Sequence, residues 1–61
     1  MTLEEESVLD FIDKNPRCTR QDIQFKFGIS LSKVNSILMI LSAYEKIKTN
    51  IFEFPNRFVK V

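Results

Sequence analysis

The residues best suited to contact another molecule lie in the segment 31–45. Five small, polar or flexible side chains recur there every three or four residues: Ser32, Asn35, Ser36, Met39 and Ala43. Successive helical residues are about 100° apart, so this spacing places all five on one face of a helix. Hydroxyl and amide groups can hydrogen-bond to base edges, asparagine can make two bonds to adenine, and an apolar side chain can contact a thymine methyl group. Because the face carries no acid, it indicates a surface that approaches DNA.

Catalytic and metal-binding chemistry finds little support in the composition. The 61 residues include no histidine, no tryptophan and one cysteine, Cys18. This inventory excludes an intramolecular disulfide, a Cys/His zinc cluster and a histidine-assisted nucleophile. The run Glu4, Glu5 and Glu6 is explained by its place at a helix start, and Cys18 by burial in a connector, although Arg17 beside it would favour the thiolate. We therefore expect no enzyme, no catalytic residue, no metal, no cofactor and no small-molecule ligand.

The charges are divided unevenly along the chain. The net charge is +1, but residues 1–13 carry five acids and no base, a charge of −5, whereas residues 14–61 carry nine bases and three acids, a charge of +6. Such a division allows one side of a small domain to face a polyanion while the other side faces away. An ordinary mixed-charge surface explains the same counts equally well.

Three helices are expected in the first three quarters of the chain, at about residues 2–14, 20–27 and 31–45. The first opens with a capping box from Thr2 to Glu5 and stops before Pro16, since a residue that precedes proline is disfavoured in a helix. Its buried stripe consists of Val8, Leu9, Phe11 and Ile12.

The second and third helices are separated by Gly28, the only glycine. Thr19 caps the second helix and Ser30 the third. Glycine adopts the left-handed conformation that commonly ends a helix without steric cost, so Gly28 is expected to end the second helix. The stripe expected to be buried on the third helix consists of Val34, Ile37, Leu38, Leu41 and Tyr44.

The last part of the chain, residues 47–61, predicts a β-hairpin. It is rich in β-branched and aromatic residues, and "FPNR" places proline and asparagine where a turn prefers them. With Pro55 and Asn56 as the loop, Phe54 pairs with Arg57, and the face toward the core holds Phe52, Val59 and Val61. A shift of one residue would instead offer Ile51 and Phe58. The segment 17–19 is short enough to be only a connector or a brief edge strand.

The order helix, connector, helix, tight turn, helix and hairpin resembles the winged helix-turn-helix family of DNA-binding domains over nearly the whole chain. In that family the glycine of the turn has apolar residues five and one before it and one, six and nine after it. Two helices that cross steeply through a short turn need a left-handed corner and a shared apolar cluster. Gln24 departs from the family pattern, which has a small residue there. The matching positions around Gly28 are Ile23, Phe27, Ile29, Val34 and Ile37.

The resemblance implies one α+β domain over residues 1–61, mostly α, with a three-helix core and a hairpin wing. It also implies sequence-specific binding of double-stranded DNA by a small transcriptional regulator, with the third helix in the major groove and the wing on the backbone or in the minor groove. By position, Arg57 is the candidate for groove entry and Lys48 for a phosphate contact, and the amides capped by Thr19 can receive a phosphate. The candidate DNA-binding residues are Thr19, Arg20, Lys26, Ser30, Ser32, Lys33, Asn35, Ser36, Met39, Lys48, Arg57 and Lys60.

Two other functions remain open at this point. Small residues with an exposed methionine also suit a protein-binding or dimerising surface, so a winged helix that binds a protein in place of DNA is the alternative. A minor alternative is a Zα-like domain that binds left-handed DNA, which Asn35 and Pro55 resemble. Met39 stands where that branch has a tyrosine, and the tandem prolines and tryptophan of its wing are lacking.

The size of the chain and its hydropathy suggest its setting. A domain of about 60 residues buries only about 60% of the surface of its unfolded chain, so its stability is expected to be marginal. Such a unit offers a small DNA footprint, and a homodimer would enlarge it. No apolar run approaches the roughly 20 residues that a membrane span needs. We therefore expect no membrane partner and a reducing compartment, the cytoplasm with its nucleoid or another intracellular one.

Overall fold

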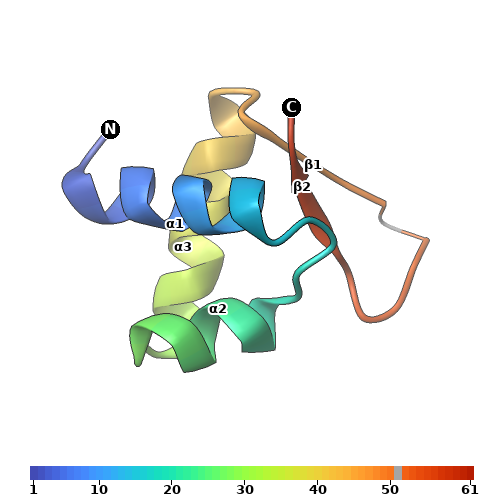
Figure 1. Cartoon of the computed structure of the whole chain (residues 1–61), viewed down its shortest axis with the longest axis horizontal. Coiled ribbons are helices and arrows are strands. Elements are labelled where there is room, and N and C mark those ends of the chain that lie inside the picture. Colours follow the sequence, from blue (N-terminus) through green and yellow to red (C-terminus); the bar gives the residue numbers. More distant parts are fainter. Residues whose placement is uncertain (51) are drawn as a thin grey trace.

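The structure, a computed structural model, describes residues 1–50 and 52–61. Three helices are followed by a two-stranded antiparallel sheet (Figure 1). The mostly helical α+β class is therefore confirmed, and the layout is compatible with a winged helix. The elements are α1 (Leu3–Lys14), α2 (Arg20–Phe27), α3 (Leu31–Ala43), β1 (Ile47–Thr49) and β2 (Phe58–Lys60).

All three helix starts are fixed by the side chains that the sequence indicates. Thr2 accepts a hydrogen bond from the Glu5 amide at 3.2 Å, and the Glu5 carboxylate accepts one from the Thr2 amide at 3.0 Å. Thr19 and Asp22 form the same reciprocal box at the start of α2. Ser30 accepts a bond from the amide three residues on. Each bond satisfies a backbone donor that has no partner within its helix, which explains why these starts were predictable.

Gly28 sets the angle between α2 and α3. It ends α2 in the left-handed conformation, with φ at 61°, and its amide donates to the Gln24 carbonyl at 2.8 Å. The two helices are bent by 114° relative to one another, within the range of a helix-turn-helix. Ile23 and Val34 are fully buried across this corner. The other three positions of the family pattern also contact the core, one buried and two half-buried: Ile37, Phe27 and Ile29.

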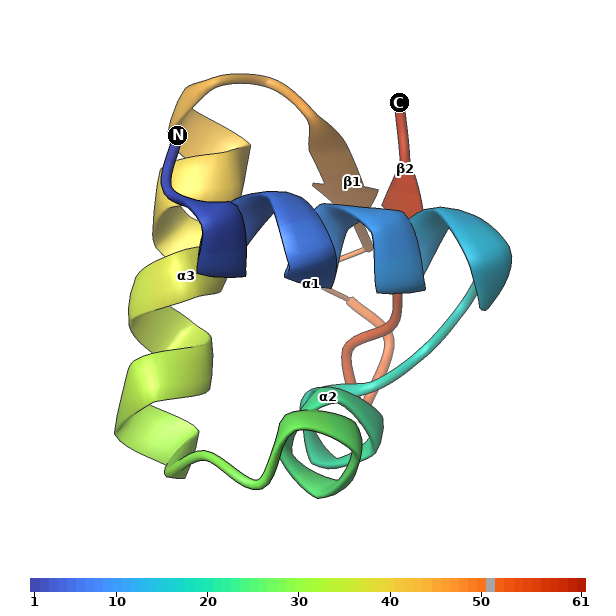
Figure 2. The same ribbon diagram turned by 60° about the vertical axis from the view of Figure 1, so that its left-hand side comes forward.

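The core lies where α1 crosses α3 and the sheet closes the far side (Figure 2). Apolar residues from all three helices, the connector and both strands form one cluster, so no element is stable without the others. The edge of α1 meets α2 through the rings of Phe11 and Phe27, which are 5.8 Å apart and nearly perpendicular. The buried members are Val8, Ile12, Cys18, Ile23, Val34, Ile37, Leu38, Leu41, Ile47 and Phe58.

The hairpin forms, but the expected register is wrong. Thr49 pairs with Phe58 and Ile47 with Lys60, so the chain between the paired strands runs from residue 50 to 57 and is much longer than a turn at 55–56. Of the three residues expected in the core on this basis, Phe52 and Val61 are exposed, Phe52 at 92%, and Val59 is half-buried and not part of the core cluster. Phe58 is buried in their place. Ile51, its expected companion on the competing face, lies outside the described residues.

Phe58 is selected because it has a second backbone partner. Its amide donates to the Cys18 carbonyl at 2.9 Å, and its carbonyl accepts from the Arg17 amide at 2.9 Å. The connector therefore acts as the brief edge strand considered from the sequence. A register with Phe52 inward would give up these two bonds, and each buried backbone group left unpaired costs about 1–3 kcal/mol.

The third helix is slightly shorter than expected. It ends at Ala43, and Tyr44 is the C-cap residue with an exposed side chain, so its assignment to the buried stripe is wrong. Glu45 follows in the left-handed conformation, with φ at 57°. Leu41 is thus the last buried residue of α3, and the chain changes direction directly after Tyr44.

Replacing Gly28 by alanine tests the left-handed corner. An added Cβ meets no heavy atom within 4 Å, so the expected cost is backbone strain alone, about 1–2 kcal/mol. Part of this cost is offset, because the unfolded alanine chain has less conformational entropy to lose than the unfolded glycine chain. Urea unfolding followed by circular dichroism should show a loss of about 1 kcal/mol for Gly28→Ala and a smaller loss for Gly28→Asn, because asparagine tolerates this conformation. An alanine variant as stable as the parent would contradict the corner.

A second test uses the buried thiol. Burial raises the pKa of Cys18 above its ordinary value of 9.0, and the charge of Asp22 raises it further. The folded chain then holds this proton more tightly than the unfolded chain, so the contribution of Cys18 to stability is complete below about pH 9 and is lost as the pH rises toward the folded pKa.

We expect the difference in unfolding free energy between the parent chain and Cys18→Ala to shrink as the pH rises above about 9. The alanine variant controls for every other ionisable group, because it keeps all of them. A difference that stays constant with pH would mean that the thiol ionises as readily in the folded chain as in the unfolded one.

Candidate nucleic-acid interface

The outer face of α3 is exposed as the sequence predicts. Ser32, Asn35, Ser36 and Met39 are all exposed, Met39 at 72%, whereas the opposite stripe of the helix is buried. No residue of α3 is acidic. A helix face without carboxylates avoids repulsion from phosphates on either side of a groove, and a helix fits the major groove, which is about 12 Å wide.

The serine hydroxyls differ in what they can still offer. Ser30 accepts a bond from the Lys33 amide at 3.2 Å, so it holds the helix start in place. Ser36 donates to the Ser32 carbonyl at 3.1 Å, one turn earlier, which leaves its oxygen as an acceptor. The Ser32 hydroxyl has no partner among the described residues and can donate outward. Of the three, Ser32 is therefore the most versatile hydrogen-bonding group.

A polar contact joins α2 to this face. The Arg20 Nε atom donates to Asn35 Oδ1 at 2.7 Å, and the guanidinium carbon lies 5.1 Å from the centre of the Phe58 ring. A cation above an aromatic face is attracted by the ring electrons. Arg20 is thus held by Asn35 of α3 and by the ring of Phe58 in β2, and it lines the space beside α3.

That space is a groove between α3 and the hairpin. It brings together two predicted DNA-binding residues of α3, Asn35 and Met39, with Arg20 from α2. Two further polar residues, Ser42 and Thr49, were missed from the sequence. No local signal marks Thr49, because its place beside the groove depends on the strand register, which the sequence leaves open. The complete lining is Arg20, Asn35, Leu38, Met39, Ser42, Thr49 and Phe58.

Arg57 lies at the base of the wing and not at its tip. It is half-buried, its Nη1 atom donates to the Arg17 carbonyl at 2.9 Å, and its Nε atom lies 3.6 Å from a Glu53 carboxylate oxygen. Glu53 also accepts two bonds from Arg17, at 3.0 and 3.1 Å. Arg57 thus ties the loop to the connector, while Lys48 is exposed on β1. No local sequence signal identifies Arg17 as this partner.

Two candidate lysines are paired with acids of α1. Lys33 Nζ lies 3.3 Å from Glu4 Oε1, and Lys60 Nζ lies 3.9 Å from Asp13 Oδ2. The acidic and basic parts of the chain are therefore in contact and do not face fully opposite ways. Exposed pairs of this kind contribute about 0–1 kcal/mol, so a phosphate can replace the carboxylate at little cost.

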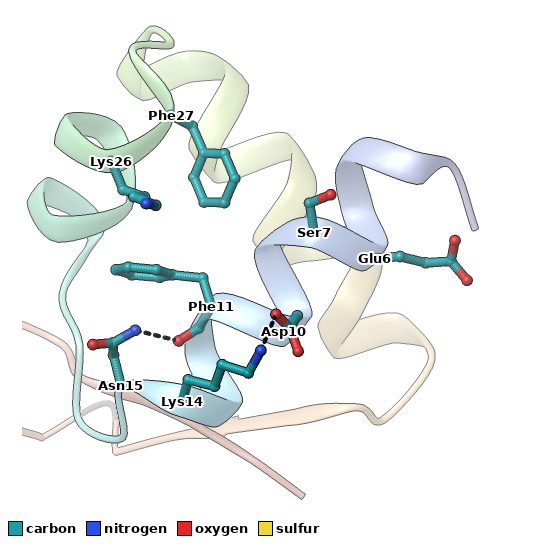
Figure 3. Close-up of a pocket in the computed structure, with 8 residues that line it drawn as sticks. All are labelled: Glu6, Ser7, Asp10, Phe11, Lys14, Asn15, Lys26 and Phe27. Atoms are coloured by element: carbon teal, nitrogen blue, oxygen red, sulfur yellow. Dashed lines mark hydrogen bonds and ion pairs between the residues drawn. The ribbon is translucent and has the colours of Figure 1, made fainter.

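Lys26 and Thr19 are the predicted DNA-binding residues whose positions suit a DNA contact least. Lys26 borders a cavity between α1 and α2, near Phe11, and it is not part of the groove beside α3 (Figure 3). Thr19 is buried, and the first amides of α2 lie beside the Asp22 carboxylate that completes the capping box. A phosphate approaching this helix end would meet that negative charge.

The described part of the chain shows no metal-binding cluster and no single helix that could span a membrane. No group of three or more Cys, Asp or Glu side chains is arranged to hold a metal ion there. None of the three described helices is long and apolar enough to cross a membrane by itself, and α2 with α3 reaches that length only as a bent pair. Comparison of the chain with protein-family models, with curated proteins and with solved structures finds no match.

The two basic residues of the wing should differ in their effect on stability. Arg57→Ala removes a hydrogen bond to a backbone carbonyl and an ion pair, so we expect the unfolding free energy to fall by about 1 kcal/mol. Lys48→Ala removes an exposed side chain and should change it by less than about 0.5 kcal/mol. Urea unfolding measures both. Equal effects would contradict the assignment of Arg57 to the base of the wing.

Proposed function

We propose that this chain is a winged helix-turn-helix protein that binds double-stranded DNA and acts as a small transcriptional regulator. The observation that supports this function best is the exposed, acid-free face of α3 beside a groove that contains Arg20, on a helix pair bent by 114°. A steep bend lets one helix project while the other braces it, which is the arrangement that helix-turn-helix proteins use to place a helix in the major groove.

In this proposal α3 enters the major groove with Ser32, Asn35 and Met39 toward the bases. Lys33 at the start of α3 and Lys48 on β1 contact the phosphates on the two sides of the groove. Arg57 contributes to the wing chiefly through its bonds to the connector. Phosphate contacts set position and affinity, whereas contacts to base edges set sequence preference.

The small net charge of the chain does not conflict with this role. Two of the candidate lysines, Lys33 and Lys60, are paired with carboxylates in the free protein, and a phosphate that displaces Glu4 from Lys33 restores one positive charge to the contact surface. Each phosphate contact releases counterions and adds about −0.9 to the slope of log affinity against log salt concentration. Three contacts, from Lys33, Lys48 and one arginine, give a slope of about −3.

Fluorescence anisotropy of a labelled random-sequence duplex, titrated at several salt concentrations, tests this proposal. We expect binding that weakens with salt, and a double variant Lys33→Gln, Lys48→Gln that binds more weakly and has a slope less steep by about 2. Lys26→Gln is the matched control, because it removes one charge at the α1–α2 cavity and should leave the slope nearly unchanged. If the double variant behaves like the control, the assigned surface is wrong.

A protein-binding function is the second candidate, and exposed aromatic side chains favour it. Phe25 on α2 and Phe52 and Phe54 in the loop of the wing are exposed at 92, 92 and 96%. Large apolar side chains of this kind are common at protein interfaces. If the parent chain binds no duplex at low salt, this second function replaces the first, and substitution of the three phenylalanines becomes the next experiment.

A further inference from the structure

Arg20 and Asn35 form a single unit on the proposed DNA-binding surface. They lie 15 residues apart on different helices and are joined by the 2.7 Å bond from Arg20 Nε to Asn35 Oδ1. An amide nitrogen cannot accept this bond, so the carboxamide must turn its oxygen toward Arg20 and its Nδ2 group away. The guanidinium also lies over the ring of Phe58, with its carbon 5.1 Å from the ring centre. Both side chains are therefore oriented before any partner arrives.

The groups that this unit can offer to a base are donors. The Nη1 and Nη2 groups of Arg20 and the Nδ2 group of Asn35 have no hydrogen-bond partner among the described residues. The acceptor that an asparagine needs for a bidentate contact to adenine is Oδ1, which must accept a bond from the adenine amino group. One of the two lone pairs of that oxygen already accepts a charge-assisted bond from Arg20, so an adenine contact would have to share the oxygen with Arg20.

We propose that Arg20 recognises a guanine in the major groove and that Asn35 is its positioning residue. Guanine presents two adjacent acceptors there, O6 and N7, and the paired Nη groups of an arginine match them. Adenine presents one acceptor and one donor at the same edge, so it would leave one of these donors facing another donor. This inference rests on the proposed DNA binding and specifies the base that the groove beside α3 prefers.

Arg20 has an alternative role in the same complex, as a phosphate contact that carries no sequence information. The two roles differ in whether a lysine can substitute for Arg20. Lysine keeps the positive charge and satisfies a phosphate, but it lacks the planar pair of donors that a guanine edge requires. Arg20→Lys therefore separates base recognition from simple attraction to the backbone.

The experiment begins with selection of preferred duplexes from a random pool by the parent chain. Each guanine in the selected site is then replaced by adenine, with its partner cytosine changed to thymine, and in a separate duplex by 7-deazaguanine, which lacks the N7 acceptor. Anisotropy should reveal one guanine whose change to adenine weakens parent binding about 10- to 100-fold. Removal of N7 alone should weaken it less, because one of the two bonds remains.

For Arg20→Lys, we expect this guanine-to-adenine ratio to fall to about one or two, with weak binding to unrelated duplexes retained. Asn35→Ala leaves the guanidinium without its side support, so the ratio should fall partway. Lys33→Gln is the control, because it removes a phosphate contact and should weaken both duplexes equally. Circular dichroism of each variant checks folding. Asn35 is exposed, so Asn35→Ala keeps the test valid if Arg20→Lys loosens the packing of Phe58.

The inference is overturned if the selected duplexes require no guanine, or if the guanine-to-adenine ratio survives in Arg20→Lys, as a phosphate contact predicts. It is also overturned if Arg20→Lys and Asn35→Ala lose affinity equally for all duplexes. A parent chain that binds every duplex with the same affinity refutes the guanine contact and leaves DNA binding in place. A parent chain that binds no duplex refutes both.

Discussion

The packing of Phe58 is the interaction on which the rest of the structure depends. Its ring is buried in the core, its backbone pairs with Thr49 on one side, and it exchanges two hydrogen bonds with the connector on the other. The connector joins α1 to α2, so this one residue holds the hairpin against the helices. In a chain this small the apolar core supplies little surplus stability, and backbone pairing of the wing to the connector supplements it.

The same residue links the core to the proposed DNA-binding surface. The guanidinium of Arg20 lies over the Phe58 ring, and Arg20 in turn holds the carboxamide of Asn35 on α3. A long, charged side chain normally loses considerable entropy when a partner immobilises it, and here the fold has already met much of that cost. The remainder of the α3 face is held less tightly, since Met39 and Ser32 contact solvent. One part of the surface is thus rigid and one part adaptable.

The sequence predicted the helices well and the hairpin poorly, for physical reasons. Thr2, Thr19, Ser30 and Gly28 act on backbone groups within four residues of themselves, so their effects can be deduced from local spacing. The strand register depends on competition between Phe52 and Phe58 for one position in the core. It is decided by Cys18, which lies 40 residues from Phe58 along the chain. The Arg20–Asn35 bond and the ion pairs to α1 also join distant residues, and spacing alone contains no signal for them.

If the chain binds DNA as proposed, stability and sequence preference are coupled in one half of the groove and separable in the other. Any change that shifts Phe58 also moves the support of Arg20, so variants of the wing or connector are expected to alter both properties together. Met39 and Ser42 border the same groove but are exposed and contribute nothing to the buried cluster. Substitutions there change the groove without disturbing the core. A duplex-binding chain with this architecture can acquire new sequence preferences most readily through the outer face of α3, while Arg20 and Phe58 stay fixed.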